Sequence, residues 1–215
     1  MANLIFWDAD TQHDFMLPDG RMYVPNAEHL APNLKQLTEY AHAADIPIVA
    51  TACDHSLEDA EISSKPDLMR TFPPHCLRHT TGSRKIPATT MRHPVVIETE
   101  RLDPNRLRAL VEDHDGEVLV KKQQFDVFTN PNAGGVVEAL APDHAVVYGV
   151  PLETTARMAI DGLLERGVTV HLVTDAVQAL RPEAAPALLE AWGRRGIRMT
   201  STAEIVNGGY LTRLG

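Results

Sequence analysis

Acidic, sulfur, imidazole and amine side chains occur where the apolar runs of this sequence end. Asp10 follows the run LIFWDA, Cys53 and His55 follow IPIVATA, and Lys122 follows EVLVK. These are the groups that acid–base and nucleophilic catalysis use. If the runs are neighbouring parallel strands, the side chains meet at one edge of the sheet. The alternative is that these residues have only structural roles, with the acids capping loops and the lysines exposed to solvent.

The apolar runs have the length and composition of buried parallel strands. They span residues 4–9, 46–52, 117–121, 144–150 and 168–176, and a further short strand is expected at 93–98. Helical patterns lie between them at residues 27–44, 103–112, 133–140, 154–166 and 182–194. This alternation predicts a three-layer α/β fold, with a parallel, doubly wound sheet between helices. No repeat or linker divides the chain, so we expect residues 1–215 to form a single domain.

The composition argues against several classes of protein. A formal net charge of −9 disfavours nucleic acid as the main partner, because phosphate binding needs clustered Lys and Arg. No apolar run approaches the roughly 20 residues of a membrane span, and the first residues lack the basic segment of a signal peptide. Two cysteines, Cys53 and Cys76, are too few for a disulfide scaffold. We therefore expect a cytoplasmic protein whose cysteines are thiols or ligands.

The segment YGVPLETTARM, residues 148–158, predicts a strand, a tight turn and the start of a helix. α/β enzymes often place a nucleophile at such an elbow. This elbow carries Pro151 and the pair Thr154 and Thr155, and no Cys, Ser or His. A second unusual region, residues 54–90, has little periodicity and many Pro, Ser and Thr residues. Loops of that length in a compact domain are usually functional.

Four motifs occur in order along the chain: DTQHDF at 10–15, FPPHC at 72–76, KQQFDVF at 122–128, and the Gly149–Val150 elbow. Together they resemble the isochorismatase-like hydrolases, and the segment PPHC…TTG looks most like the nicotinamidase branch. The resemblance implies a parallel sheet of about six strands between helices, and assembly as a homo-oligomer, either dimer or tetramer. It also implies an Asp-Lys-Cys triad whose thiolate attacks an amide or similar carbonyl. A nearby divalent metal would bind or orient the small-molecule substrate.

The resemblance assigns roles to particular residues. Asp10 matches the proton-transferring acid, Lys122 matches the triad lysine, and Phe15 matches a position that walls the substrate pocket. Lys121 points to the opposite strand face and fits less well. Asp8 lies two positions before Asp10 on the same face. It either lies close enough to raise the pKa of one carboxyl group and contributes to the pocket, or it bonds to backbone.

Two positions at the elbow depart from the triad pattern. Counting back from Gly167 places Thr155 where the nucleophilic Cys belongs, and a hydroxyl is far less acidic than a thiol and needs a dedicated base. In the family, the residue at Pro151 follows a cis peptide bond and its N–H helps to form the oxyanion hole. Proline favours the cis bond but has no N–H, a loss of about 3 kcal/mol where such donors have been tested. We therefore expect the elbow to keep its shape, with Pro151 at the substrate, and to lose the usual thioester route.

The metal site differs from the family pattern in one ligand. The resemblance implies D-x-H within the segment ATACDHS, where His55 matches the His and Cys53 replaces the Asp. His75 of PPHC matches the remaining His ligand. Together, Cys53, His55 and His75 would form a soft donor set that favours zinc over a hard cation. Two alternatives stay open: Asp54 supplies an oxygen ligand, or the site is vacant and Cys53 is a small buried residue.

Several functions stay open at this point. The first is a family hydrolase that acts on a small amide or carboxylate in a pocket with Asp10 and Lys122, by a route other than the usual thioester. Asp10 could then be a general acid for a vinyl ether, or a metal could activate water. The second is a pseudoenzyme that binds a small ligand or supports a partner subunit. The sequence contains no nucleotide fingerprint, so we expect no nucleotide cofactor.

Overall fold

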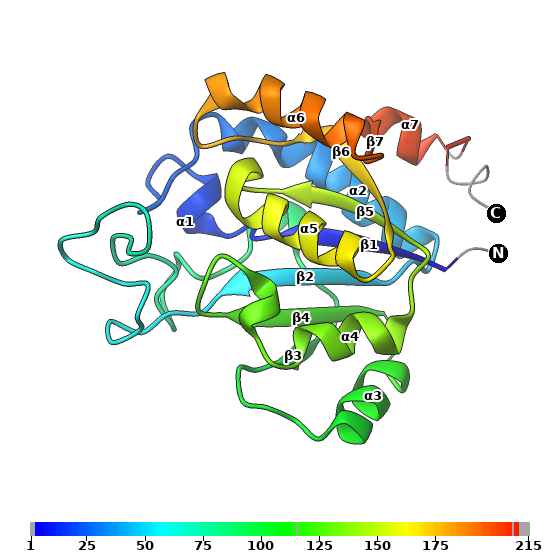
Figure 1. Ribbon diagram of the computed structural model, residues 1–215, viewed down its shortest axis with the longest axis horizontal. Coiled ribbons are helices and arrows are strands. Elements are labelled where there is room, and N and C mark those ends of the chain that lie inside the picture. The colour runs from blue at the N-terminus through cyan, green and yellow to red at the C-terminus, as the bar shows by residue number, and fades with distance from the viewer. Residues whose placement is uncertain (1–2, 115, 208, 211–215) are drawn as a thin grey trace.

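One parallel sheet of seven strands forms the centre of the computed structural model, which describes residues 3–114, 116–207 and 209–210 (Figure 1). The strands are β1 (Leu4–Ala9), β2 (Ile48–Cys53), β3 (Val95–Ile97), β4 (Glu117–Lys122), β5 (His144–Gly149), β6 (Thr169–Val177) and β7 (Arg198–Thr200). Their order across the sheet is β3-β4-β2-β1-β5-β6-β7, and every neighbouring pair is parallel. From β1, the chain builds the sheet outward in both directions, through β2 on one side and through β5 on the other. This change of direction is the topological switch point, where open α/β sheets bind ligands.

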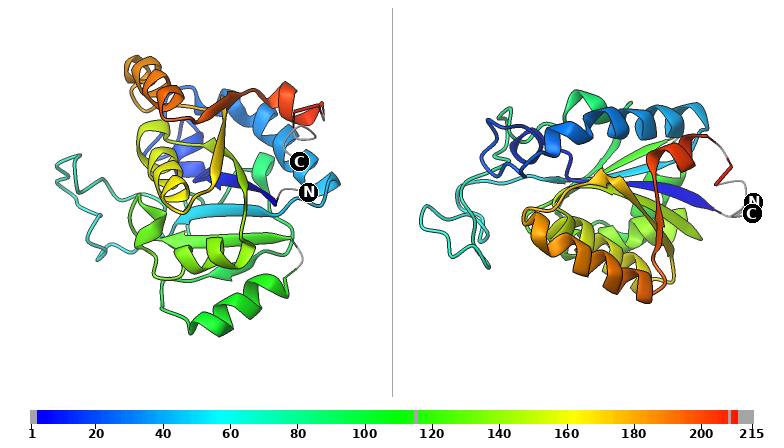
Figure 2. Two further views of the ribbon diagram at one scale, coloured as in Figure 1. Left: turned by 45° about the vertical axis from the view of Figure 1, so that its right-hand side comes forward. Right: turned by 90° about the horizontal axis from the view of Figure 1, so that it is seen from above.

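Helices cover both faces of the sheet, as Figure 2 shows in the view from above. They are α1 (His13–Met16), α2 (Ala31–Ala43), α3 (Pro104–Glu112), α4 (Ala133–Leu140), α5 (Arg157–Glu165), α6 (Ala185–Arg194) and α7 (Thr202–Val206). Buried residues of α2 and α7 share one core cluster, and those of α3, α4, α5 and α6 share the other. The prediction of a three-layer α/β fold is therefore confirmed.

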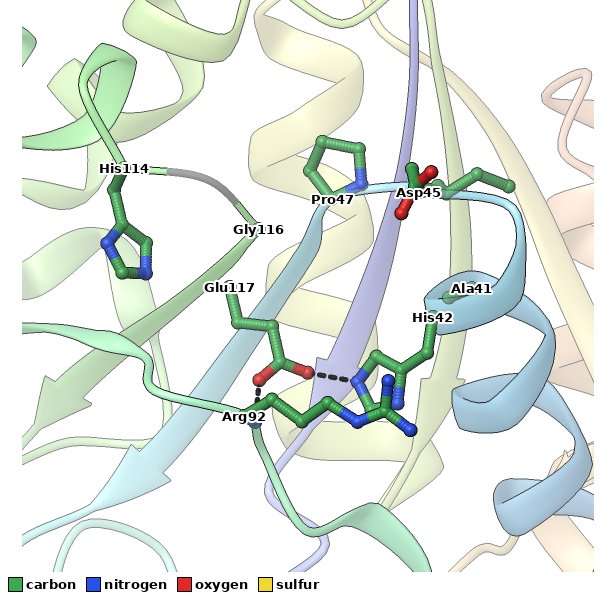
Figure 3. Close-up of a pocket in the computed structure, with 9 residues that line it drawn as sticks. Ala41, His42, Asp45, Pro47, Arg92, His114, Gly116 and Glu117 are labelled. Atoms are coloured by element: carbon green, nitrogen blue, oxygen red, sulfur yellow. Dashed lines mark hydrogen bonds and ion pairs between the residues drawn. The ribbon is translucent and has the colours of Figure 1, made fainter.

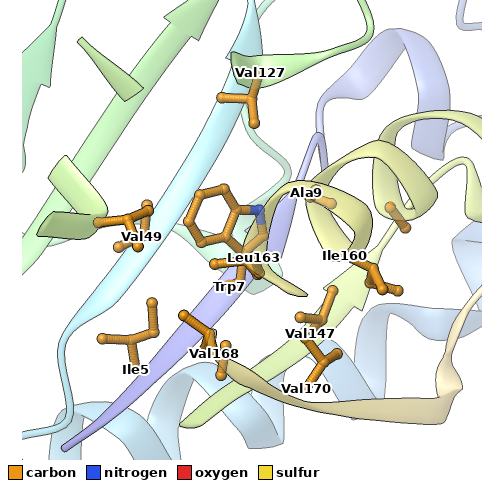
Figure 4. Packing of buried hydrophobic residues seen from close by; sticks show 14 of the residues in the cluster. Ile5, Trp7, Ala9, Val49, Val127, Val147, Ile160, Leu163, Val168 and Val170 are labelled. Atoms are coloured by element: carbon orange, nitrogen blue, oxygen red, sulfur yellow. The ribbon is translucent and has the colours of Figure 1, made fainter. Parts of the chain in front are cut away.

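The two core clusters are separated by the sheet. Figure 4 shows the cluster around Trp7, whose fully buried indole is surrounded by aliphatic side chains of the strands and α5, among them Val49, Val147 and Leu163. The other cluster includes Phe6 and Leu34 of α2. Trp7 and Phe6 are neighbours on β1 and point to opposite faces, because side chains alternate along a strand. A continuous apolar run in the sequence thus serves both cores.

The predicted elements differ from the structure mainly at their ends. Pro32 lies in the first turn of α2, as its position in the pattern requires. The helix expected at 154–166 begins as a π-helical turn, Leu152–Ala156, before α5. The strand β7 was not predicted because three residues give too short an apolar run. The helix α7 was also missed, although Ser201 and Glu204 form a capping box, which is a recognisable start signal.

The long aperiodic segment lies beyond the carboxyl-terminal ends of the strands (Figure 1, cyan to green). From Asp54 to Ile86 the segment has only isolated bridges, such as the one between His55 and Leu77, and the 3-10 turn Pro87–Thr89 follows. Within the described residues, no helix is both long and apolar enough to cross a membrane.

Gly149 is the residue on which the end of β5 depends. Its φ of +111° lies in the region that favours glycine, and a Cβ built there would lie 2.1 Å from the carbonyl oxygen of Ala9. Ala9 pairs with Gly149 in the register of β1 and β5. The close approach of the two backbones leads directly into the cis peptide bond between Val150 and Pro151.

We predict that Gly149→Ala destabilises the protein by about 2–4 kcal/mol, because both the backbone conformation and the contact with Ala9 exclude a methyl group. Gly193→Ala is the matched control. Gly193 lies in α6, and a Cβ added there would meet no heavy atom within 4 Å, so alanine should be neutral or stabilise by up to about 1 kcal/mol. Urea denaturation of the two variants measures the difference, and equal midpoints would contradict the prediction.

Candidate functional site

The ends of four adjacent strands supply the three predicted catalytic residues and one predicted metal ligand, Cys53. In the sheet order β4-β2-β1-β5, the strand ends carry Lys122, Cys53, Asp10 and the elbow with Thr155. Cys53 and Lys122 are directly paired in the register of β2 and β4. Asp10 comes immediately after β1 with a φ of +47°, a left-handed conformation that is uncommon outside glycine and often marks a functional position.

Asp10 is the centre of the contacts at this edge. Its Oδ2 lies 2.7 Å from Nζ of Lys122 and accepts a hydrogen bond of 2.9 Å from the hydroxyl of Thr155. Its Oδ1 accepts one of 2.5 Å from Thr51. The side chains of Asp10 and Lys122 are fully buried. Moving two charges out of water has a penalty of several kcal/mol each, which excellent geometry and further hydrogen bonds must offset.

Lys122 also contacts the sulfur of Cys53. Its Nζ lies 3.1 Å from Sγ and donates to the carbonyl oxygen of Gln124 at the same distance. The Cys53 thiol in turn lies 3.6 Å from Oδ2 of Asp10. Lys121 points the other way, as alternation predicts, and pairs with Glu98 at 2.9 Å on the surface. The structure therefore brings Asp10, Lys122, Thr155 and Cys53 together.

The electrostatics of the cluster differ from those of exposed groups. Burial and the nearby Cys53 raise the pKa of Asp10 from 3.8 to about 6, although Lys122 and its hydrogen bond act in the opposite direction. Burial raises the pKa of Cys53, but a hydrogen bond from Cys76 and the charge of Lys122 outweigh it, and that pKa lies well below its usual range. Burial lowers the pKa of Lys122, and the charges of Asp10 and Cys53 reverse this and raise it. The arrangement favours a protonated lysine beside anionic partners.

The predicted metal ligands also lie together. One donor atom from each of Cys53, His55 and His75 lies within 4.8 Å of the other two, and all three residues are buried. Nδ1 of His75 lies 2.8 Å from the carbonyl oxygen of Pro73, which can only accept, so the proton is on Nδ1. This leaves the lone pair of Nε2 free, which is how ligand histidines are usually oriented.

Unpaired polar atoms support the fit of a metal. Nε2 of His75 and both ring nitrogens of His55 are buried and have no hydrogen-bond partner in the described part of the chain. The same is true of Oε2 of Glu61, which lies 3.6 Å from Nε2 of His55. Asp59 lies 3.5 Å from Nδ1 of His55. Buried polar atoms are normally satisfied, so this cluster of free donors fits a divalent cation. Asp54 pairs instead with Arg78 at 2.7 Å.

The three residues predicted at the substrate lie in different surroundings. The ring of Phe15 packs edge-on against His75, with 5.4 Å between centroids, and so lies against the cluster of Cys53, His55 and His75. Pro151 follows the cis bond at the elbow, as expected. Asp8 forms an ion pair of 2.9 Å with Lys85 and accepts a hydrogen bond of 2.8 Å from Thr11. These contacts tie Asp8 to the segment before the 3-10 turn.

Three residues of the site were not predicted. Thr51 lies two positions before Cys53 on the same strand face, and that spacing was the one available signal. Gln12 holds the end of β2, because its side chain bonds both the N–H and the C=O of Cys53 at 2.8 Å. Glu61 belongs to the aperiodic loop, and its free carboxylate oxygen depends on how that loop folds.

A cavity of about 400 Å³ adjoins this cluster. Its lining includes Glu61 and Phe125, which also contact the cluster, together with Phe72, Gln124 and Met158. The ring of Phe125 lies 5.6 Å from Nζ of Lys122. The described lining contains none of Asp10, Lys122, Cys53, His55 and His75, so the cavity borders the cluster through Glu61 and Phe125. The size suits a small molecule.

A second cavity, of about 260 Å³, lies at the opposite end of β4 (Figure 3). There, Oε1 of the buried Glu117 lies 2.5 Å from Nε2 of His42, and its other oxygen accepts from the backbone N–H of Arg92. Both carboxylate oxygens are thus used within the protein. Because the Asp10 cluster lies at the carboxyl ends of the strands, where α/β sheets bind ligands, it is the better candidate.

Solved structures share this fold at low sequence identity. A pyrazinamidase of Pyrococcus horikoshii in complex with zinc is 22% identical, with a TM-score of 0.72, and the match covers 93% of this chain and 99% of that one. An isochorismatase family protein from Desulfovibrio vulgaris is 18% identical, with a TM-score of 0.76 and coverage of 96% and 98%. N-carbamoylsarcosine amidase from Thermoplasma acidophilum is 17% identical, with a TM-score of 0.69 and coverage of 93% and 96%.

None of the curated proteins matches the chain. The description of the family whose model does match is Isochorismatase domain, and the match extends from residue 4 to residue 204. It includes all the strands of the sheet and every residue of the cluster around Asp10. On this evidence, the chain belongs to the isochorismatase family.

Proposed function

We propose that this protein is a hydrolase of small amide- or carboxylate-type molecules that react beside Asp10 and Lys122. The observation that carries the proposal is the fully buried Asp10–Lys122 ion pair, with the Thr155 hydroxyl on the same carboxylate oxygen. A buried ion pair is weak evidence for stability alone, and burial with a shifted pKa next to a cavity is typical of a functional site. Two of the solved structures with this fold are amidases by name, which favours an amide substrate.

The side chains of the site have different chemical roles in this proposal. Asp10 takes a proton from the attacking group and returns it to the leaving group, since its raised pKa places both protonation states within reach near neutral pH. Lys122 keeps a positive charge beside the reacting atoms and holds Asp10 in place. Pro151 cannot donate an N–H to a developing oxyanion. The stabilisation of that charge must therefore come from other groups.

We further propose that the cluster of Cys53, His55 and His75 holds a divalent metal, with zinc favoured by its sulfur and imidazole donors. A zinc ion bound there would supply a Lewis acid for a substrate carbonyl. His75 is held for this role by its bond to Pro73. Phe15 and Phe125 flank the ring of His75 and exclude water from that side.

The first test concerns the proton-transfer group. Asp10→Asn should lower kcat/KM by about 10²–10⁴-fold, because the amide can neither accept nor return a proton. Ammonia release from a panel of small amides, including nicotinamide and pyrazinamide, provides the assay. Asp161→Asn, which removes a surface carboxylate paired with Arg195, is the control and should leave the rate unchanged. Absence of hydrolysis by the zinc-loaded wild type across the panel would favour a binding protein without catalysis.

The pH dependence follows from the raised pKa of Asp10. Its carboxylate must be ionised to accept a proton, so kcat/KM should fall as the pH drops below about 6. Because the native pKa lies above the ordinary 3.8, the native state binds this proton more tightly than the unfolded state. The free energy of unfolding should therefore decrease as the pH rises from 3.8 towards about 6. Asp10→Asn should remove this contribution to the pH dependence of stability. Rate profiles that stay flat from about pH 5 to 8 would contradict the role of Asp10.

A third test measures zinc binding by the proposed metal site. His75→Ala should weaken zinc binding by at least about tenfold, because it removes an oriented imidazole donor. His29→Ala, whose side chain is 75% exposed, is the control. Competition with a chromogenic chelator measures the affinity, and elemental analysis measures the zinc content of each protein. Unchanged affinity in His75→Ala would exclude this cluster as the zinc site.

A further inference from the structure

The sulfur of Cys53 lies between the two charged groups of the site. Its Sγ is 3.1 Å from Nζ of Lys122 and 3.6 Å from Oδ2 of Asp10. The hydroxyl of Thr155 donates to the same Asp10 oxygen at 2.9 Å. Two groups that could attack a substrate therefore share one carboxylate. Cys53 is additionally in contact with the ammonium group, which stabilises a thiolate.

We propose that Cys53, at the end of β2, is the nucleophile of this protein and takes over the task that position 155 cannot perform. The proposal rests on the hydrolase function proposed above. A thiol exchanges its proton far more readily than an aliphatic hydroxyl, and its anion is a strong nucleophile towards carbonyl carbon. With Cys53 in this place, the site contains an acid, an ammonium and a thiol within mutual contact.

The backbone fixes the sulfur in position. Gln12 bonds both the N–H and the C=O of Cys53 at 2.8 Å, and the register of β2 and β4 places Cys53 opposite Lys122. A nucleophile held on a strand end by hydrogen bonds loses little freedom on reaction, which is the advantage of a preorganised site. Thr155 lies instead in a π-helical turn.

The reaction balances without any oxidant or reductant. The proton of the Cys53 thiol passes to Asp10, and Sγ forms a bond to the carbonyl carbon of the amide. The C–N bond then breaks as Asp10 returns the proton to nitrogen, and ammonia or an amine leaves. Water adds to the thioester carbonyl and gives a proton to Asp10, the C–S bond breaks, and Asp10 reprotonates the sulfur. The products are a carboxylic acid and the amine, with Cys53 and Asp10 restored.

The sulfur cannot be a metal ligand and a free nucleophile at the same moment, because coordination withdraws the electron pair that attacks. During turnover the metal would then rely on His55 and His75, with the unpaired Oε2 of Glu61 3.6 Å from His55 as a further donor. The two tasks of Cys53 can be separated by substitution. Aspartate retains an anionic donor at this position and removes the thiol.

The Cys53→Asp variant should keep zinc near the wild-type content and lose amide hydrolysis by roughly 10³-fold or more, as for other covalent nucleophiles. Elemental analysis and ammonia release provide the two readouts. Rapid acid quenching of the wild type during turnover, followed by peptide mass spectrometry, should find the acyl group on the peptide that contains Cys53. Cys76→Ser keeps a hydrogen-bond donor beside Cys53 and removes the other thiol, so the adduct should remain on the Cys53 peptide. An adduct on Thr155, or full activity in zinc-loaded Cys53→Asp, would overturn the proposal.

Alkylation of the wild type by iodoacetamide tests the nucleophile without any substrate. Cys53 should be labelled at least about tenfold faster than Cys76, since the Sγ of Cys53 lies 3.1 Å from the ammonium group of Lys122, which stabilises a thiolate. Equal or slower labelling of Cys53 would contradict its role as the nucleophile, even if the enzyme hydrolyses amides. Selective labelling of Cys53 in a protein that hydrolyses no amide of the panel would leave the reactive thiol in place and overturn the proposed function instead.

Discussion

The ion pair between Asp10 and Lys122 determines how the rest of the site is built. Two opposite charges 2.7 Å apart and fully removed from water are tolerated only when their remaining hydrogen-bonding groups are satisfied. Thr51 and Thr155 complete the carboxylate, and the Gln124 carbonyl completes the ammonium. Each of these partners comes from a different segment. The pair therefore ties β1, β2, the elbow and the loop after β4 into one unit.

The parallel sheet is what makes such a pair possible. All strands run in one direction, so the residues that follow β1, β2, β4 and β5 lie at one edge. The strict register places Cys53 beside Lys122, and the pairing of Ala9 with Gly149 brings the elbow next to Asp10. The left-handed backbone of Asp10 then turns its carboxylate into the space between the strand ends. Local strain of about 1–3 kcal/mol at this residue is offset by its buried contacts.

Sequence reasoning predicted six of the seven strands, most of the helices and several residues that the structure brings together at the strand ends, because each of these leaves a local pattern. Apolar runs mark the buried strands, and Asp10, Cys53 and Lys122 follow directly after three of them. The cis bond at Pro151 was expected from the motif. Thr51 gave no comparable signal, since a threonine inside a buried strand fits the pattern of the sheet itself. Glu61 reaches the histidines only through the tertiary path of an aperiodic loop, which no periodicity encodes. β7 was too short to be detected.

The charges of the cluster favour a cation beside it, which supports the proposed metal. Asp10 and Cys53 both lie against the buried ammonium group of Lys122, and the Glu61 carboxylate lies close by, so several groups that can be anionic share this cation. The mutual repulsion is visible in the pKa values of Asp10 and Glu61, which burial and Cys53 raise together. A divalent ion bound by the neutral donors of His55 and His75 would neutralise this excess. It would also leave the sulfur close to the positive charge that stabilises a thiolate. In the proposed reaction, the thiol at position 53 supplies the reactive atom beside Lys122, while the hydroxyl at position 155 supplies only a hydrogen bond to Asp10.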